Sequence, residues 1–193
     1  MTSGPVTDVL TREHAEHSAP EQVPRHHLHA ARLRRILVAL APAIAFLAVR
    51  QLGVLILMAM AAVNDTTART ELASWDGQWY LGIAAGGYGG VPGWLVDAHG
   101  LRSPETPLAF FPGYPVLVGW VAELPFLALG PAAFLVTATF GVLAAYGLAR
   151  IGCEITGGSR RAGLVLVTLF AASPMGVVLS MTYSEAMFCA LAA

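Results

Sequence analysis

An aspartate lies among aromatic residues just after the first long apolar run of the chain. The segment Trp75–Tyr80 reads Trp-Asp-Gly-Gln-Trp-Tyr, so Asp76 is held between indole and phenol rings. Such rings favour the boundary between membrane and water, because part of each is apolar and part can form hydrogen bonds. A carboxylate held at that boundary can do chemistry on a lipid-linked substrate.

The composition indicates an integral membrane protein. Of the 193 residues, 56% are hydrophobic and 12% are charged, and the apolar residues come in long blocks. The charged share is about half of what a soluble domain carries. We therefore predict an all-α, polytopic transmembrane protein. Cys153 and Cys189 predict no structural disulfide, and His26, His27 and His29 lack a partner ligand at zinc spacing, so no metal site is predicted.

The amino-terminal part predicts a tail followed by a membrane helix. Residues 1–35 are polar and predict a disordered tail, which Arg32, Arg34 and Arg35 hold in the cytoplasm by the positive-inside rule. Residues 36–63 form an apolar run long enough for a first span. A cleaved signal peptide is the alternative, since Ala59-Met60-Ala61 resembles a processing site. The long tail and the long apolar run favour a membrane anchor.

Three further apolar runs follow a long connection. Residues 131–149 and 162–180 predict a second and a third span, and a fourth run begins at residue 186. Arginines dominate the loop between the second and third spans, which places this loop in the cytoplasm. Because the fourth run stops after eight residues, we expect residues 36–193 to be the amino-terminal part of a larger transmembrane domain.

The connection, residues 64–130, is predicted to lie outside the membrane. It carries six acidic residues against two arginines. Ser74 is expected to cap a short helix running to about Ala85, with Trp75 and Trp79 on one face. Residues 91–107 predict an irregular loop, and residues 116–124 predict a helix lying in or near the membrane interface.

Two more residues suggest chemistry. Arg50 interrupts the first apolar run, and a guanidinium at membrane depth costs about 2.5–3.5 kcal/mol on insertion scales. It either pairs with a neighbouring helix or lines a cavity and binds an anion such as a lipid phosphate. Counting the spans places Glu185 on the same extracytoplasmic face as Asp76. This pair predicts either a site at the lipid surface or simply two surface carboxylates.

Four sequence features together resemble the PIG-V family of membrane mannosyltransferases. The Trp75–Tyr80 segment resembles the family's Trp-Asp-x-x-Trp-Tyr segment, and Phe110–Pro115 resembles its Phe-Phe-Pro-x-Tyr-Pro segment. Tyr183-Ser184-Glu185 resembles its Tyr-Ser-Glu segment, and Arg50 falls where the family usually has an arginine. The resemblance covers residues 32–193.

The resemblance implies a GT-C glycosyltransferase with a lipid-borne donor. Such an enzyme would transfer mannose from a polyprenyl-phosphate mannose, with inversion, to an acceptor hydroxyl of a glycan or glycolipid. Asp76 would be the catalytic base, Arg50 would face the departing phosphate, and Glu185 would orient the acceptor or hold an ion. The remaining residues expected to bind substrate are Trp75, Trp79, Tyr80 and Tyr183. The 193-residue chain by itself is expected to be inactive.

The resemblance also bears on partners, location and rivals. No further cofactor and no nucleic acid are expected, and the partners are membrane lipids, donor and acceptor. We expect a multi-pass protein of a bacterial cell membrane with its amino terminus in the cytoplasm. A transporter component would also place charges along a membrane cavity, but it should show inverted repeats, and none is visible. A non-catalytic membrane subunit would use the aromatic residues merely as anchors.

Overall fold

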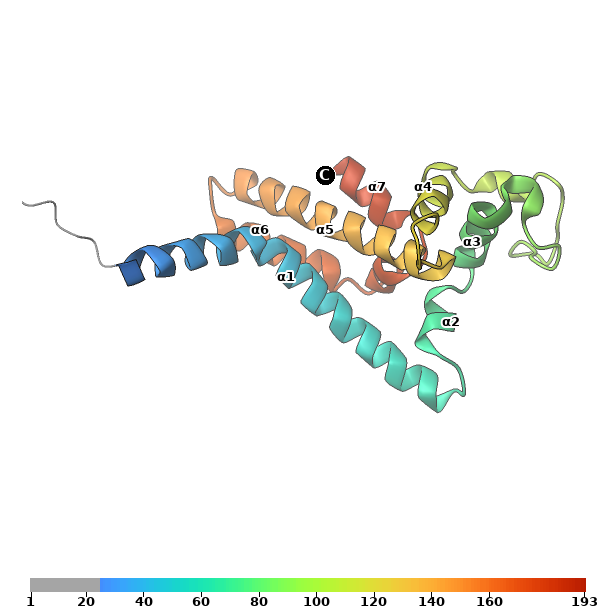
Figure 1. Ribbon diagram of the computed structural model, residues 1–193, viewed down its shortest axis with the longest axis horizontal. Helices are drawn as coiled ribbons and strands as arrows, with labels where there is room; N and C mark the ends of the chain where they lie inside the picture. Colours follow the sequence, from blue (N-terminus) through green and yellow to red (C-terminus); the bar gives the residue numbers. More distant parts are fainter. Residues whose placement is uncertain (1–24) are drawn as a thin grey trace, which may run out of the picture. The chain divides into compact units, whose positions relative to one another are not determined.

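The computed structural model describes residues 25–193, with side chains from Arg32 onward (Figure 1). Every regular element in this range is a helix, which confirms the predicted all-α class for the described residues. The chain divides into two units, residues 1–39 and 40–193. Helix α1 (Arg25–Val63) begins in the first unit and ends in the second.

The beginning of α1 corrects the predicted tail. Of residues 1–35, residues 1–24 lie outside the described residues, whereas residues 25–35 are helical. No glycine or proline occurs between Arg25 and Ala41, and alanine, leucine and arginine are frequent there. These residue types have high helix propensity, so the helix starts well before the apolar run.

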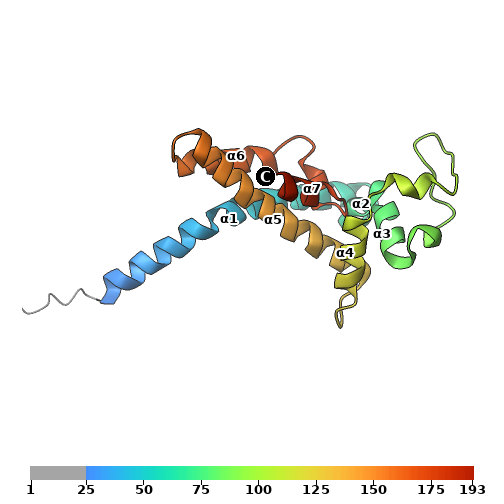
Figure 2. The same ribbon diagram turned by 90° about the horizontal axis from the view of Figure 1, so that it is seen from above.

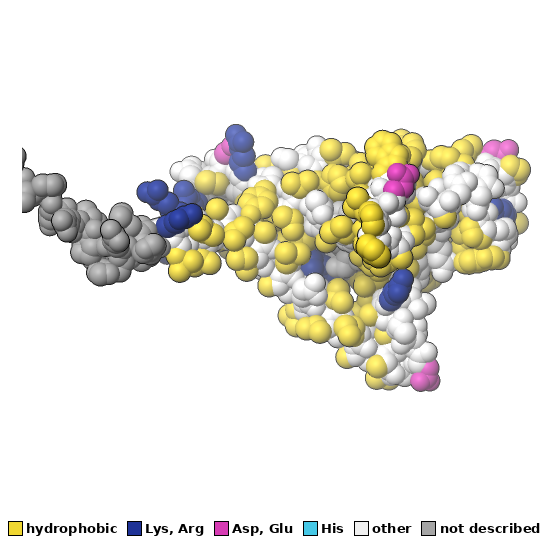
Figure 3. All heavy atoms as spheres, viewed as in Figure 1, with side chains coloured by type: hydrophobic (Ala, Val, Ile, Leu, Met, Phe, Trp, Pro, Cys, Tyr) yellow, Lys and Arg dark blue, Asp and Glu magenta, His cyan; other side chains and the backbone are white. Residues whose placement is uncertain are grey.

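Two helices among the described residues are long and apolar enough to cross a membrane. They are α1 from Arg32 to Val63, and α5 (Leu129–Ile155). Their positions agree with the predicted runs 36–63 and 131–149, although α5 extends further at both ends. Hydrophobic side chains cover much of the visible surface of the unit formed by residues 40–193 (Figure 3).

The third predicted span, residues 162–180, is not one continuous helix. Helix α6 (Arg160–Ala171) ends early and is followed by a turn and the 3₁₀ helix η3 (Gly176–Ser180). The twelve residues of α6 rise about 18 Å, less than the roughly 30 Å of a hydrocarbon core. Pro174 explains the break, because a proline removes a backbone donor and disfavours α conformation in the residue before it.

The connection after α1 alternates between short helices and irregular segments. Its helix α3 (Asp76–Gly86) begins at Asp76 and not after a Ser74 cap, because the Ser74 hydroxyl donates to Glu71 O at 2.6 Å. The chain from residue 91 to 105 is irregular, as predicted. The other elements of this connection are α2 (Ala68–Leu72), η1 (Tyr88–Gly90), η2 (Thr106–Ala109) and α4 (Gly113–Ala122).

Helix α5 is the element on which the second unit is built. It packs against α4, α6 and α7 (Glu185–Ala192), as Figures 1 and 2 both show. Small residues allow the close approach of α5 and α6: a Cβ atom at Gly163 would collide with the carbonyl oxygen of Ala149. The buried residues Phe46, Ala145 and Val167 join α1, α5 and α6 in one apolar cluster.

Candidate functional site

The segment around Tyr183 is bound to the segment that carries Asp76. The backbone N–H of Thr182 donates to Leu72 O at 3.0 Å. The Tyr183 hydroxyl lies 3.3 Å from the backbone nitrogen of Asp76, whose N–H it accepts. The hydroxyls of Tyr80 and Ser184 are 2.7 Å apart. More than 100 residues separate the partners of each contact, so the fold brings two distant motifs into one site.

The amino-terminal end of α3 has an unusual local structure. Trp75 occupies the N-cap position with φ 55° and ψ −124°, and its side chain forms no capping hydrogen bond. A positive φ is strained for a bulky side chain, and such strain persists where the surroundings enforce it. At Gly77, any Cβ atom would collide with the Thr182 hydroxyl oxygen. Glycine is therefore what permits Thr182 to approach this end of the helix.

A buried network anchors the other side of the junction to α5. The Thr137 hydroxyl donates to Met181 O at 3.0 Å and lies 2.8 Å from the Tyr114 hydroxyl. Both side chains are almost fully buried. Because unpaired polar groups are costly in an apolar interior, this network fixes the backbone that leads into Thr182.

The pKa values of both candidate acids are shifted in the same direction. Partial burial raises the pKa of the Asp76 carboxyl above its ordinary value, although the residue as a whole is exposed. The pKa of the Glu185 carboxyl is also raised, first by burial and then by the negative charge of Asp76. Raised carboxyl pKa values bring these groups closer to the range in which they can exchange protons near neutral pH.

Two polar atoms in this junction lack partners. Among the described residues, Thr182 Oγ1 and Glu185 Oε2 are buried and accept no hydrogen bond. Buried polar atoms in proteins nearly always have partners, so exceptions call for an explanation. An incoming hydroxyl group would satisfy the free carboxyl oxygen.

The aromatic residues of the first motif have different surroundings. Trp79 is only 5% exposed, and its ring stacks on Phe110 with centroids 5.4 Å apart. The Arg102 guanidinium lies 5.5 Å from the Trp79 ring centroid. This packing gives Trp79 a structural part in the loop, where the sequence predicted a residue binding sugar or lipid. Trp75, in contrast, is 78% exposed beside Asp76.

Arg50 is buried and bonded to the chain itself. Its Nε donates to Ser180 Oγ and its Nη1 donates to Ala171 O, both at 2.9 Å. Ala171 is the last residue of α6, where carbonyl groups lack helical partners and a positive charge is favourable. Of the two readings, the structure shows the pairing with a neighbouring element.

Sequence reasoning missed several residues that shape the site. Thr182 donates its N–H to Leu72 O, the last residue of α2, and its place next to a predicted motif was the only available signal. Ser184 lies within that motif but was given no role, and its hydroxyl contacts the Tyr80 hydroxyl of α3. Arg102 was also missed. It donates to the carbonyl oxygens of Val91, Pro92 and Leu95 and so holds the loop together. No pattern in the loop sequence predicts these hydrogen bonds.

An open groove of about 650 Å³ lies at the opposite half of α3. It is bordered by α4 and by the chain that leads into α5. Most of its lining residues are apolar, and Trp120 and Glu123 also border it. The groove is separate from the junction of Asp76 and Tyr183.

Comparison with known proteins gives partial matches to one kind of enzyme. Over 128 residues the chain is 33% identical to GPI alpha-1,6-mannosyltransferase 2 of Rattus norvegicus, a match covering 61% of this chain and 23% of the rat protein. The chain is similar to these mannosyltransferases. Those of Cricetulus griseus and Mus musculus match over the same length with the same identity. This similarity supports the predicted resemblance to a PIG-V-like family.

The similarity is limited in extent. The chain spans less than a quarter of the length of the curated relatives it matches. No family model matches the chain. No solved structure matches it either.

Proposed function

We propose that this chain belongs to a membrane glycosyltransferase of the GT-C type. The enzyme would transfer mannose from a polyprenyl-phosphate mannose to an acceptor hydroxyl on the extracytoplasmic side, with inversion. The similarity to proteins named as mannosyltransferases supports the reaction class. The observation that carries the proposal is the junction of two distant segments, in which the Tyr183 hydroxyl, two residues before Glu185, accepts the N–H of Asp76 at 3.3 Å.

Asp76 is the proposed general base. As the acceptor oxygen attacks the anomeric carbon, its proton passes to the Asp76 carboxylate, and the bond to the polyprenyl phosphate breaks with its electron pair leaving on the phosphate oxygen. A carboxylate whose pKa is raised by burial is a stronger base than a fully solvated one. The exposure of this residue leaves it accessible to a substrate.

Glu185 is the proposed acceptor-orienting residue. Its Oε2 atom is buried and unpartnered among the described residues, so it can accept a hydrogen bond from a second hydroxyl of the acceptor sugar. Tyr80 and Tyr183 would border this position, and the exposed Trp75 would contact sugar or lipid. Trp79 would support the loop from behind.

Arg50 keeps a smaller proposed role near the donor phosphate. Its Nε and Nη1 atoms are already bonded to Ser180 and Ala171. Its Nη2 atom donates to no group of the described residues and lies next to Gly53. A phosphate oxygen could bind there, where charge-assisted hydrogen bonds are strong.

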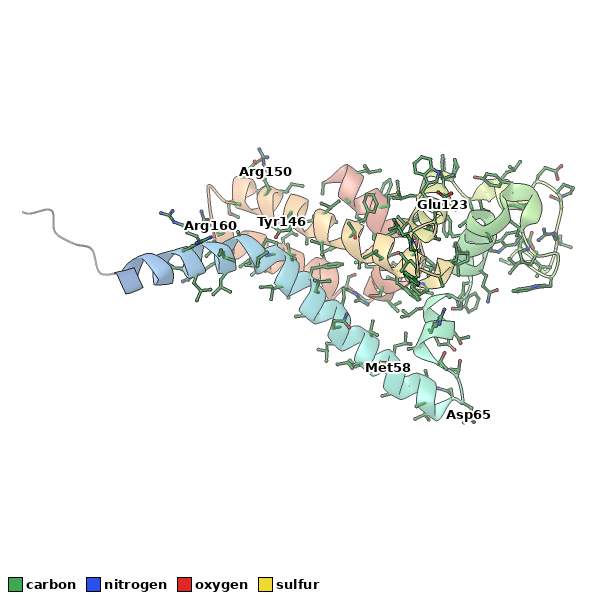
Figure 4. The ribbon with its side chains drawn as sticks, viewed as in Figure 1. Met58, Asp65, Glu123, Tyr146, Arg150 and Arg160 are labelled. Atoms are coloured by element: carbon green, nitrogen blue, oxygen red, sulfur yellow. The ribbon has the colours of Figure 1, made fainter. Side chains whose placement is uncertain are left out.

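The distribution of charge supports the proposed orientation. Figure 4 shows Arg150 and Arg160 at one end of the second unit, and Asp65 and Glu123 toward the other. The positive-inside rule would place the arginine end in the cytoplasm and the acidic end outside. We propose a multi-pass protein of a bacterial cell membrane, whose acceptor is a glycan or glycolipid.

The test is sugar transfer from labelled polyprenyl-phosphate mannose in membranes carrying the full-length protein. Asp76→Asn keeps the shape of the side chain and removes the base, so we expect transfer to fall by about 10²-fold or more. Asp65→Asn is the matched control. Asp65 is an exposed acid of the same connection with φ 54°, a conformation that asparagine also tolerates, so activity should be unchanged.

The possible outcomes separate the functions. If transfer is lost in Asp76→Asn and kept in Asp65→Asn, the result supports both the proposed donor and the role of Asp76 as the general base. Normal transfer by Asp76→Asn would refute the base assignment. Absence of transfer from correctly inserted wild-type protein would point to another donor or to a non-catalytic subunit.

A further inference from the structure

We infer that Tyr183 is a positioning residue for Asp76, because its hydroxyl caps the amino-terminal end of α3 from a distant part of the chain. The inference rests on the proposed function only for the catalytic meaning of Asp76. The capping itself is a statement about the fold.

The first observation is that α3 lacks a local cap. Helix N-termini leave backbone N–H groups unpaired, and a side chain at the N-cap position usually accepts one of them. The N-cap position here holds Trp75, whose side chain accepts nothing. Ser74, the nearest residue with a suitable hydroxyl, instead donates to Glu71 O.

The second observation is that the Tyr183 hydroxyl bridges both sides of the strained residue. It accepts the N–H of Asp76 at 3.3 Å and lies 3.4 Å from Ser74 O, to which it donates. Trp75, with its φ of 55°, lies between these two contacts. The hydroxyl therefore links the backbone before Trp75 to the backbone after it. This link holds the strained conformation of Trp75, which would otherwise relax.

The third observation is that the tyrosine ring itself is held firmly. Tyr183 is 7% exposed and belongs to an apolar cluster with Leu72 and Met181. Its neighbours on both sides are hydrogen-bonded to this region, Thr182 to Leu72 O at the end of α2 and Ser184 to the Tyr80 hydroxyl of α3. Because the ring is buried and both neighbouring residues are hydrogen-bonded, the Tyr183 hydroxyl has little freedom to move. It can therefore fix the direction in which α3 begins and Asp76 points.

The arrangement also links the two acids. Glu185 follows Tyr183 by two residues and starts α7, while Asp76 starts α3. A single tyrosine thus bonds the backbone of one acid and lies two residues before the other in the chain. Asp76 and Glu185 keep a fixed mutual position as long as this contact is made.

The variant Tyr183→Phe in the full-length protein tests the inference, since it removes one oxygen and keeps the buried ring. We expect kcat for mannosyl transfer to fall by about 10-fold to 100-fold, because small misplacement of a reacting group has effects of this size. KM for the acceptor should stay within about twofold. Tyr88→Phe is the matched control: its hydroxyl donates to Phe110 O beyond the other end of α3, and its loss should leave kcat unchanged.

Two readouts separate positioning from a general loss of stability. The first is the pH profile. The titratable groups that interact with the charge of Asp76 are Glu185, Tyr80 and Tyr183. Once Asp76 relaxes toward water in Tyr183→Phe, its raised pKa should fall, and the acid limb of kcat should move to lower pH. The second is amide hydrogen exchange, which should become faster for residues 75–77 and stay unchanged in α5.

The outcomes are decisive in each case. Unchanged exchange at residues 75–77 in Tyr183→Phe would overturn the capping role. Faster exchange with wild-type kcat and an unmoved acid limb would overturn the positioning role. If the wild type transfers no mannose, the proposed function fails, while the exchange measurement still decides whether Tyr183 caps α3.

Discussion

The two ends of α3 are built in opposite ways. At the carboxyl end, Gly87 adopts φ 69° and its N–H donates to Ile83 O at 2.8 Å, a local termination that needs nothing from elsewhere. At the amino end, a strained tryptophan and a tyrosine from 107 residues away replace the usual cap. The end with the candidate base is thus the end whose geometry depends on distant contacts.

The side of α3 that carries Trp79 packs against the irregular chain after residue 90, and this packing should supply most of the stability of α3 and that chain. Trp79 packs with Ile83, Val91 and Leu95 and stacks on Phe110. We expect Trp79→Ala to cost about 3–5 kcal/mol, the usual range for a buried aromatic residue. Trp75→Ala, at an exposed ring in the same motif, should change stability by less than about 0.5 kcal/mol. Thermal or denaturant unfolding in detergent checks both. Equal losses would contradict the difference drawn between the two rings.

The glycines of α3 offer the most direct comparison of its ends. A Cβ atom at Gly77 would collide with the Thr182 hydroxyl, whereas a Cβ atom at Gly86 meets no atom within 4 Å. Gly77→Ala should therefore cost about 1–3 kcal/mol and lower transfer, while Gly86→Ala should be neutral or slightly stabilising. Adding Thr182→Ala should recover part of the loss in Gly77→Ala. Additive effects of the two substitutions would show that this contact is not the cause.

The smallest expected effect concerns Glu185 and pH. Because its pKa is raised in the folded protein, the unfolded state binds fewer protons at intermediate pH. Folding stability should therefore rise as pH falls through the folded pKa, and the gain is complete below the ordinary glutamate pKa of about 4.3. Glu185→Gln should accordingly stabilise the protein at pH 7 by less than about 1 kcal/mol, with no advantage near pH 4. Melting temperatures at the two pH values measure this, and a constant difference would refute the explanation.

The sequence predicted the long elements better than the site. Long apolar runs located α1 and α5, because length and hydropathy are local properties. The counting of spans placed Asp76 and Glu185 on one side, and in the structure Tyr183, two residues before Glu185, bonds the backbone of Asp76. The cap could not be predicted, since a local hydroxyl at Ser74 was the obvious candidate and only tertiary packing brings Tyr183 there. The break after Ala171 was equally hidden, because an apolar run containing one proline often continues.

The break after Ala171 also affects how the segment carrying Glu185 reaches the segment carrying Asp76. Had α6 continued to Ser180, its axis would have advanced about 13 Å beyond Ala171 and turned in fixed steps of 100° per residue. Instead, Arg50 holds both ends of the interruption, at Ala171 and at Ser180. The stretch between them is therefore held at both ends, and this sets the point from which Tyr183, three residues after Ser180, reaches the backbone of Asp76.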